Sequence, residues 1–66
     1  MKKMLIKRLE GNKCWINLFR LSQRDYEEYV TWVSNLDTPD NYYWGHYFPT
    51  LEMAEKDFAD RVERGY

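Results

Sequence analysis

Hydrophobic and polar positions alternate in blocks at the start of this chain of 66 residues. Two apolar segments come first, and a short polar segment separates them. Residues 4–9 and residues 14–21 are rich in aliphatic, aromatic and β-branched side chains, which favours strands. Residues 10–13 between them are typical of a turn, in which Gly11 and Asn12 suit positive φ. In the second segment Cys14, Ile16 and Leu18 alternate with Trp15, Asn17 and Phe19. The first third of the chain therefore predicts a β-hairpin.

Residues 22–35 are compatible with either a helix or a strand. Residues 22–25 could cap a helix, and four apolar residues follow at the i, i+3, i+4, i+7 spacing of a helix face: Tyr26, Tyr29, Val30 and Val33. Residues 29–33, however, are five consecutive strand-favouring residues, and such side chains lose rotamer freedom in a helix. We therefore favour a strand over residues 27–34.

A turn and a further strand are predicted next. Pro39 suits the second position of a turn within residues 35–41, and residues 42–48 form an aromatic strand-like segment. Simple alternation along that strand would place one set of side chains on one face, namely Tyr42, Trp44, His46 and Phe48, and the other set on the opposite face, namely Tyr43, Gly45 and Tyr47. The pattern therefore predicts a second hairpin.

The last segment predicts an amphipathic helix with a signal at each end. Thr50 is a good N-cap, Glu52 lies in the first turn, where the helix dipole favours a carboxylate, and Gly65 ends the helix. Arg61 and Arg64 lie at the end that favours cations. An apolar stripe runs along it: Leu51, Ala54, Phe58 and Val62. The predicted fold class is α+β, a single domain over residues 1–66 in which one helix packs on one face of a small antiparallel sheet of three or four strands.

Aromatic residues are numerous for so short a chain. Three Phe, three Trp and six Tyr make twelve rings, and each can bury about 150–250 Å². A chain of this size buries only about 60% of its unfolded surface, and one helix covers only one face of a sheet. We therefore expect an aromatic uncovered face, which serves as a homodimer seam, as a partner site, or as the seat of the N-terminal strand folded back across it.

Charge is distributed unevenly. Residues 1–24 carry a net charge of +6 and residues 25–66 a net charge of −7, which gives the overall −1. Charge interrupts the first apolar residues, so the start of the chain does not read as a signal peptide, and no apolar run is long enough to span a bilayer. The expectation is a cytoplasmic protein without membrane contact.

Residues 29–62 resemble the three-stranded-sheet-plus-helix domains of the AP2 type and the similar N-terminal modules of tyrosine-type integrases. The residues that carry the resemblance run from the last strand into the helix: Gly45, Tyr47, Thr50, Glu52, Ala54 and Phe58. Those domains bind DNA through Arg, Lys and Trp on their strands, whereas residues 29–48 contain no Lys or Arg. The resemblance therefore implies a fold more than a function.

Candidate catalytic chemistry is sparse. His46 and Cys14 are each single residues on different strands, which is not a metal-site spacing. Cys14 is interpreted as a small apolar strand residue and His46 as a strand residue that uses its ring for packing or a hydrogen bond. Asp57 and Asp60 are interpreted as a solvated face. We therefore expect no cofactor, no metal and no enzyme.

Two binding hypotheses follow. The first is a protein-interaction module, in the manner of small phage or mobile-element proteins that inhibit a host nucleic-acid-processing or defence protein, anti-CRISPR proteins among them. Its expected partner-binding residues are Trp15, Tyr42, Tyr43, Trp44, His46 and Tyr47. The alternatives are an orphan homodimeric structural domain and a nucleic-acid-binding domain that uses basic residues of the N-terminal strands: Lys3, Lys7, Arg8, Lys13, Arg20 and Arg24.

Overall fold

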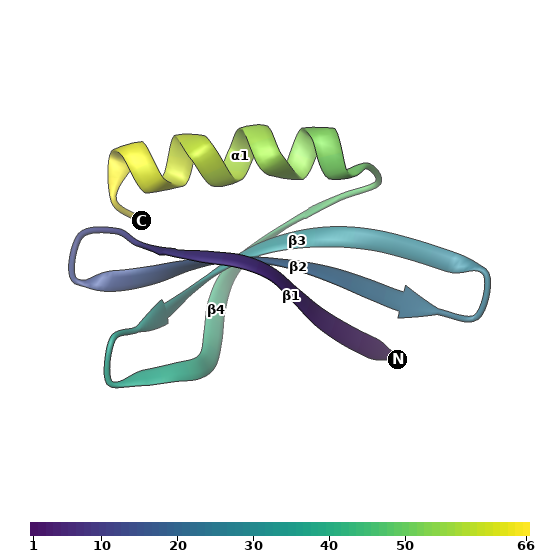
Figure 1. The fold of residues 1–66 in the computed structure, drawn as a ribbon, viewed down its shortest axis with the longest axis horizontal. Helices are drawn as coiled ribbons and strands as arrows, with labels where there is room; N and C mark the ends of the chain where they lie inside the picture. Colours follow the sequence, from purple (N-terminus) through teal and green to yellow (C-terminus); the bar gives the residue numbers. More distant parts are fainter.

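The computed structural model describes residues 1–66 as four antiparallel strands followed by one helix (Figure 1). The elements are β1 (Lys2–Glu10), β2 (Cys14–Gln23), β3 (Tyr26–Asn35), β4 (Thr38–Phe48) and α1 (Leu51–Arg64). Strands that follow one another in the chain are neighbours in the sheet, so its order is β1-β2-β3-β4 and its two edges are β1 and β4. The predicted α+β class is confirmed. Of the ambiguous residues 22–35, residues 26–35 form the strand β3, and the residues before them complete β2 and form a turn.

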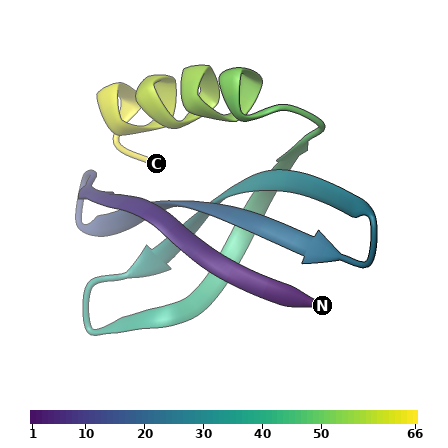
Figure 2. The same ribbon diagram turned by 45° about the vertical axis from the view of Figure 1, so that its right-hand side comes forward.

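α1 covers one face of the sheet (Figures 1 and 2). Two helix residues, Ala54 and Phe58, are buried against Ile16 and Leu18 of β2 and Val33 of β3. The alternation predicted for β2 is confirmed, because its even-numbered apolar residues face α1. Leu51, by contrast, is 38% exposed, so the apolar stripe that seals the core is shorter than predicted.

Both helix ends carry the predicted caps. The side-chain oxygen of Thr50 accepts a hydrogen bond from the backbone N–H of Met53 at 3.3 Å. Gly65 adopts φ 97°, and its N–H donates to the carbonyl of Arg61 at 2.7 Å. A left-handed residue after the last turn satisfies a carbonyl that the helix itself leaves free. The sequence signals for the start and the end of α1 are therefore confirmed.

A second apolar cluster lies on the face that α1 does not cover. Phe19, Leu21 and Val30 are buried there, with Trp32 and Tyr42 packed against them. The rings lie in contact: the centroids of Phe19 and Trp32 are 5.4 Å apart, and those of Trp32 and Tyr42 are 5.1 Å apart. The expected aromatic face is therefore present.

Side chains of the edge strand β1 partly cover this cluster. The ammonium of Lys3 on β1 lies 5.0 Å from the ring centroid of Tyr42. Arg8, also on β1, donates to the carbonyl of Pro39 at 3.3 Å and to the hydroxyl of Tyr42 at 3.4 Å, both on β4. Arg8 also donates to Asn17, which is fully buried. Of the three alternatives for this face, the one in which the N-terminal strand folds back across it is wrong, because β1 pairs beside β2 and extends the sheet.

The turn between β1 and β2 differs from the prediction. Positive φ occurs at Lys13 (62°) and not at Gly11 or Asn12. Gly11 has another role, because a Cβ there would lie 2.7 Å from the carbonyl oxygen of Gly65. The N–H of Asn12 donates to that same oxygen at 2.8 Å. This turn therefore holds the end of α1, which explains its glycine.

The turn between β3 and β4 is shorter than predicted. It consists of Leu36 and Asp37, whereas Pro39 lies inside β4. A proline cannot donate to a strand neighbour, but an edge strand leaves one side unpaired, so the missing N–H removes no ladder bond if it faces outward. The predicted position of Pro39 within the turn is therefore wrong: the turn ends before it, and an edge strand tolerates the proline.

Candidate functional site

A bulge in β4 reshapes the strand at Trp44 and Gly45. Thr31 pairs with His46 and Val33 with Tyr43, so two residues of β4 stand opposite one residue of β3. Trp44 adopts φ 54°, a left-handed conformation that is uncommon for a bulky side chain. The predicted alternation of β4 is therefore wrong, because the extra residue shifts every side chain before it to the other face.

Gly45 is required by close packing at the bulge. A Cβ at this position would lie 2.6 Å from the indole nitrogen of Trp32 and 2.9 Å from its Cδ1. No ordinary side chain fits there without moving the Trp32 ring. Gly45 thus allows the bulge to sit directly on the aromatic cluster of the sheet.

Arg61 of α1 binds the backbone of the bulge on the sheet face that α1 covers. Its side chain is buried, with 2% of the residue surface exposed. Nη1 donates to the carbonyl of Trp44 at 2.8 Å, to the carbonyl of Thr31 at 3.2 Å and to the hydroxyl of Thr31 at 3.1 Å. Burial lowers the pKa of the Arg61 guanidinium from its ordinary value, and the nearby carboxylate of Asp57 opposes this shift. The role predicted for Arg61, a cation at the helix end, is therefore only part of its function.

Asp57 joins the helix to two strands. One of its carboxylate oxygens accepts a hydrogen bond from the Thr31 hydroxyl at 2.6 Å and lies 2.9 Å from Nδ1 of His46. The expectation that Asp57 belongs to a solvated face is wrong, since its side chain is 19% exposed and faces the sheet. His46 is a strand residue whose ring makes a hydrogen bond, as the sequence indicated.

A hollow of about 270 Å³ lies beside this cluster at the C-terminal end of α1. It is lined by Trp44, His46, Arg61, Arg64 and Tyr66. Trp44 is 64% exposed and Tyr66 is 53% exposed, and their ring centroids are 6.5 Å apart in an edge-to-face arrangement. The structure therefore gathers two exposed rings, two guanidinium groups and an imidazole at one place, which we call the Trp44 site.

The six residues expected to bind a partner are divided between the two faces. Trp44 and His46 line the Trp44 site, and the ring of Tyr43 contacts that of Trp44 at 5.2 Å. Tyr42 and Tyr47 contact Trp32 on the opposite face. Trp15 lies near the start of β2, and its indole N–H donates to the carbonyl of Leu36 at 3.4 Å.

Sequence reasoning missed three residues of the Trp44 site: Arg61, Arg64 and Tyr66. The two arginines were assigned to the helix dipole alone, and Tyr66 lies beyond the helical pattern. An available signal was the position of Arg61, three residues after Phe58 and therefore close to the apolar stripe.

The basic residues expected for nucleic-acid binding are not gathered into one stripe. Lys7 pairs with Glu55 at 3.1 Å on the α1 side. Lys3 and Arg8 lie over the opposite face, where their partners are aromatic rings, Asn17 and β4. Arg20 faces the α1 side beside Met4, and Lys13 and Arg24 occupy turns at opposite ends of the sheet. The arrangement does not form a continuous phosphate-binding surface.

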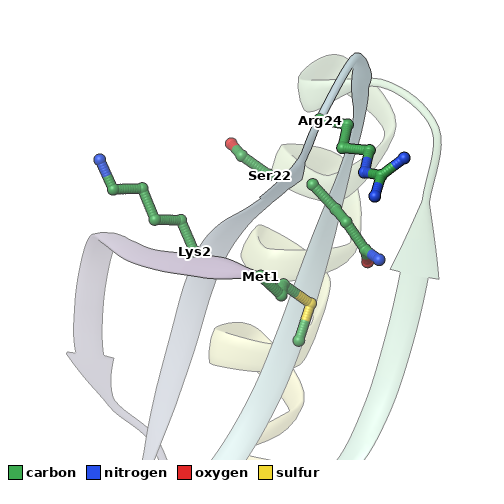
Figure 3. Close-up of a pocket in the computed structure, with 5 residues that line it drawn as sticks. Met1, Lys2, Ser22 and Arg24 are labelled. Carbon is green, nitrogen blue, oxygen red and sulfur yellow. The ribbon is translucent and has the colours of Figure 1, made fainter.

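A larger hollow, of about 530 Å³, lies where β1 begins and β2 ends (Figure 3). Its lining residues are Met1, Lys2, Ser22, Gln23 and Arg24. Figure 3 shows that the side chains of Lys2 and Arg24 point in different directions and do not converge on a common point. We therefore do not regard this hollow as the functional site.

The edge strand β1 is the other exposed apolar region. Met4 is 52% exposed and Leu9 is 51% exposed. The register with β2 shifts between Leu5 and Lys7, which marks a bulge, and lysines flank it. Bulges and lysines are devices that protect an edge from pairing with another chain. These features disfavour a homodimer through this edge.

Cys14 is buried beneath the end of α1. Its thiol donates to the carbonyl of Gly65 at 3.1 Å. Burial raises the pKa of the Cys14 thiol above its ordinary value of 9.0, while the charge of Arg61 and a hydrogen bond from the backbone of Asn12 oppose the rise. The interpretation of Cys14 as a packed strand residue agrees with this position.

The raised pKa of Cys14 predicts a loss of stability at alkaline pH. The unfolded chain releases the thiol proton at a lower pH than the folded chain, so the unfolding free energy falls as the pH rises from about 9 through the folded pKa. Urea denaturation at several pH values should show a steeper alkaline loss for the native chain than for Cys14→Ala. Tyrosine ionisation affects both proteins alike, so parallel curves would contradict the prediction.

Comparison of the chain with protein-family models, with curated proteins and with solved structures finds no match in any of the three. The resemblance to AP2-type domains accordingly stays a prediction. α1 is not long and apolar enough to cross a membrane. No three His, Cys, Asp or Glu side chains are grouped so that they could hold a metal ion.

Proposed function

We propose that the protein is a non-enzymatic interaction module that binds another protein through the Trp44 site. The observation that carries this proposal is the conformation of Trp44, an exposed tryptophan in left-handed backbone geometry that a buried arginine holds in place. Such geometry costs of order 1–3 kcal/mol and is concentrated at functional positions. The Trp44 ring itself points largely into solvent, since the residue is 64% exposed.

The composition of the site supports binding. Tryptophan, tyrosine and arginine are the residue types that dominate hot spots of protein interfaces, and the Trp44 site contains Trp44, Tyr66 and Arg64 on one exposed surface. The bulge and the helix both fix this surface, so a partner would meet side chains that are already positioned. Preorganisation of this kind reduces the entropy lost on association.

The same geometry gives little support to catalysis. His46 and Asp57 form an acid–base pair, but an activated nucleophile must lie within hydrogen-bond reach of such a base. The thiol of Cys14 is buried and donates to Gly65 instead. We therefore assign His46 and Asp57 to positioning the bulge.

A finer form of the proposal is a phage or mobile-element inhibitor of a nucleic-acid-processing or defence protein. Its support is the small size of the chain and its wealth of rings. In that role the Trp44 site would occupy a surface that the target protein needs.

Substitution of Trp44 tests the proposal. Affinity capture from a lysate of the organism that encodes the protein should recover a partner with the native chain. Trp44→Ala should weaken its binding about 30-fold or more, which corresponds to the 2 kcal/mol of a hot spot. Trp44→Gly should lose the partner equally and yet fold at least as stably as Trp44→Ala, because glycine tolerates positive φ.

The matched control is Tyr26→Ala. Tyr26 is 59% exposed and lies at the β2–β3 end of the sheet, where its hydroxyl contacts Glu28. This variant should capture the partner as well as the native chain does. Equal capture by the native chain and by a folded Trp44→Ala variant would show that the proposed surface is wrong.

A further inference from the structure

The guanidinium group of Arg61, a residue that lines the Trp44 site, has hydrogen-bond donors that no acceptor of the chain uses. An arginine carries five N–H donors, and all three hydrogen bonds of Arg61 come from Nη1. Its Nε is buried and has no acceptor. Arg61 lines the hollow although only 2% of its surface is exposed. The hollow thus has a nearly buried, incompletely satisfied cation in its wall.

No carboxylate of the chain neutralises Arg61 directly. Asp57 is the nearest candidate, but its oxygen is already bonded to Thr31 and to His46. Arg61 forms no ion pair within 4.0 Å, whereas Arg64 pairs with Asp60 at 3.0 Å. A buried cation is stable only when partners compensate for its lost hydration. An anionic group in the hollow would provide that compensation.

We propose that the hollow of the Trp44 site receives a carboxylate group of the partner protein, an inference that rests on the proposed function and names the group this site recognises. Arg61 forms the inner wall and Arg64 the rim, where its guanidinium lies 5.4 Å from the ring centroid of Tyr66. Guanidinium groups bind carboxylates with short, charge-assisted hydrogen bonds. The rings of Trp44 and Tyr66 limit water around the ion pair and so strengthen it.

The charges around the hollow favour a single negative charge over a double one. Arg64 is paired with Asp60, and Asp57 is bonded to Thr31 and to the Nδ1 of His46, so Arg61 is the one guanidinium of the hollow without an ion pair. The single charge of Arg61 matches the charge of one carboxylate. A phosphate dianion would leave one charge unmatched beside two aspartates.

Titration of the isolated protein with small anions tests the inference by NMR. The signals of interest are the Nε–Hε group of Arg61 and the indole N–H of Trp44. Sodium acetate should shift both signals along a saturable curve, whereas sodium chloride at the same ionic strength should not. Shifts that are linear and equal for the two salts would overturn the inference, as would tighter binding of phosphate than of acetate at the same signals.

Two further probes distinguish the source of the carboxylate. N-acetyl-glutamate α-amide presents a side-chain carboxylate, and N-acetyl-alanine presents a chain-terminal one. Saturable binding of either probe supports the inference, and the tighter one identifies the source. Binding of neither probe overturns it.

Variants separate a specific site from general charge effects. Arg64→Gln keeps the buried Arg61 in place and should weaken acetate binding at least threefold. Arg20→Gln is the matched control, because Arg20 also has an unpartnered Nε but lies beside Met4, far along the sheet. Equal acetate affinities in the two variants would overturn the assignment. Since no partner protein is used, this experiment can fail while the Trp44 capture succeeds, and the reverse.

Discussion

Replacement of Phe58 by alanine is expected to lower the free energy of unfolding by about 3–5 kcal/mol. Phe58 is 2% exposed and is the largest apolar side chain that α1 buries against the sheet. A chain of this length has a total stability of roughly 3–10 kcal/mol, so the variant should lose at least about a third of that stability. Urea denaturation followed by circular dichroism and tryptophan fluorescence measures the change.

Leu51→Ala is the control for the Phe58 prediction. It removes an aliphatic side chain from the same helix, but Leu51 is 38% exposed and lies outside the buried cluster. Its expected cost is about 1 kcal/mol or less. Equal losses for the two variants would mean that α1 does not seal the core through Phe58.

The elements that could be predicted are those whose signal is local or periodic. Thr50 and Gly65 mark the ends of α1 because the chemistry of a helix cap depends on the residue at one position. The side chains of β2 alternate regularly, so the residues facing α1 could be assigned from the sequence. Residues 26–35 were harder, since a helical spacing competed with strand propensity, and pairing with two neighbouring strands favours the strand.

The bulge at Trp44 could not be predicted from the two-residue period with which strand side chains alternate between faces. One extra residue in β4 reverses the faces of the residues before it, and the alternation by itself gives no sign of where such a residue lies. Gly45 was an available cue, because glycine within a strand often marks a bulge or a close approach. Whether Trp44 or Gly45 would take the left-handed conformation depends on the Trp32 ring, which only the folded sheet places there.

The Trp44 site depends on contacts between distant segments. Arg61 meets Thr31 and the bulge of β4 across thirty and seventeen residues of sequence. The position of Arg61 three residues after Phe58 indicates that it lies near the apolar stripe, but it does not show which strand atoms the guanidinium meets. The sequence therefore pointed to Trp44 and His46, whereas Tyr66 and the two arginines of the site became visible only in the fold.

The contacts that partly cover the sheet face opposite α1 could not be predicted from the sequence either. The number of rings predicted an aromatic face, and Trp32 and Tyr42 are on it. Its polar edge, in which Asn17 donates to Ser34 at 3.0 Å and Arg8 spans to β4, depends on how far the strands twist. Twist and edge-to-edge contacts are properties of the whole sheet and leave no local signal.

Replacement of Arg61 by methionine is expected to lower the free energy of unfolding by about 2–4 kcal/mol. Methionine fills a similar space but donates no hydrogen bond, so the carbonyl of Trp44 and both oxygens of Thr31 lose a donor. Each buried acceptor without a partner costs about 1–3 kcal/mol. The gain from no longer burying a cation offsets part of this sum, because an apolar residue needs no compensating charge.

The same substitution should release the bulge as well as destabilise the fold. Without the bond from Nη1, the backbone of Trp44 has lost the contact that fixes its left-handed conformation, so its indole N–H signal should move toward the position seen in unfolded chains. Arg64→Met is the matched control, since Arg64 lies at the same helix end with a side chain that is 45% exposed; its expected cost is about 0.5 kcal/mol. A fully stable Arg61→Met variant with an unchanged Trp44 signal would mean that packing around Trp32 and Gly45, and not Arg61, holds the tryptophan in place. In that event Arg61 would not be needed for the fold, and ligand binding would be the remaining explanation for a buried cation at the wall of the hollow.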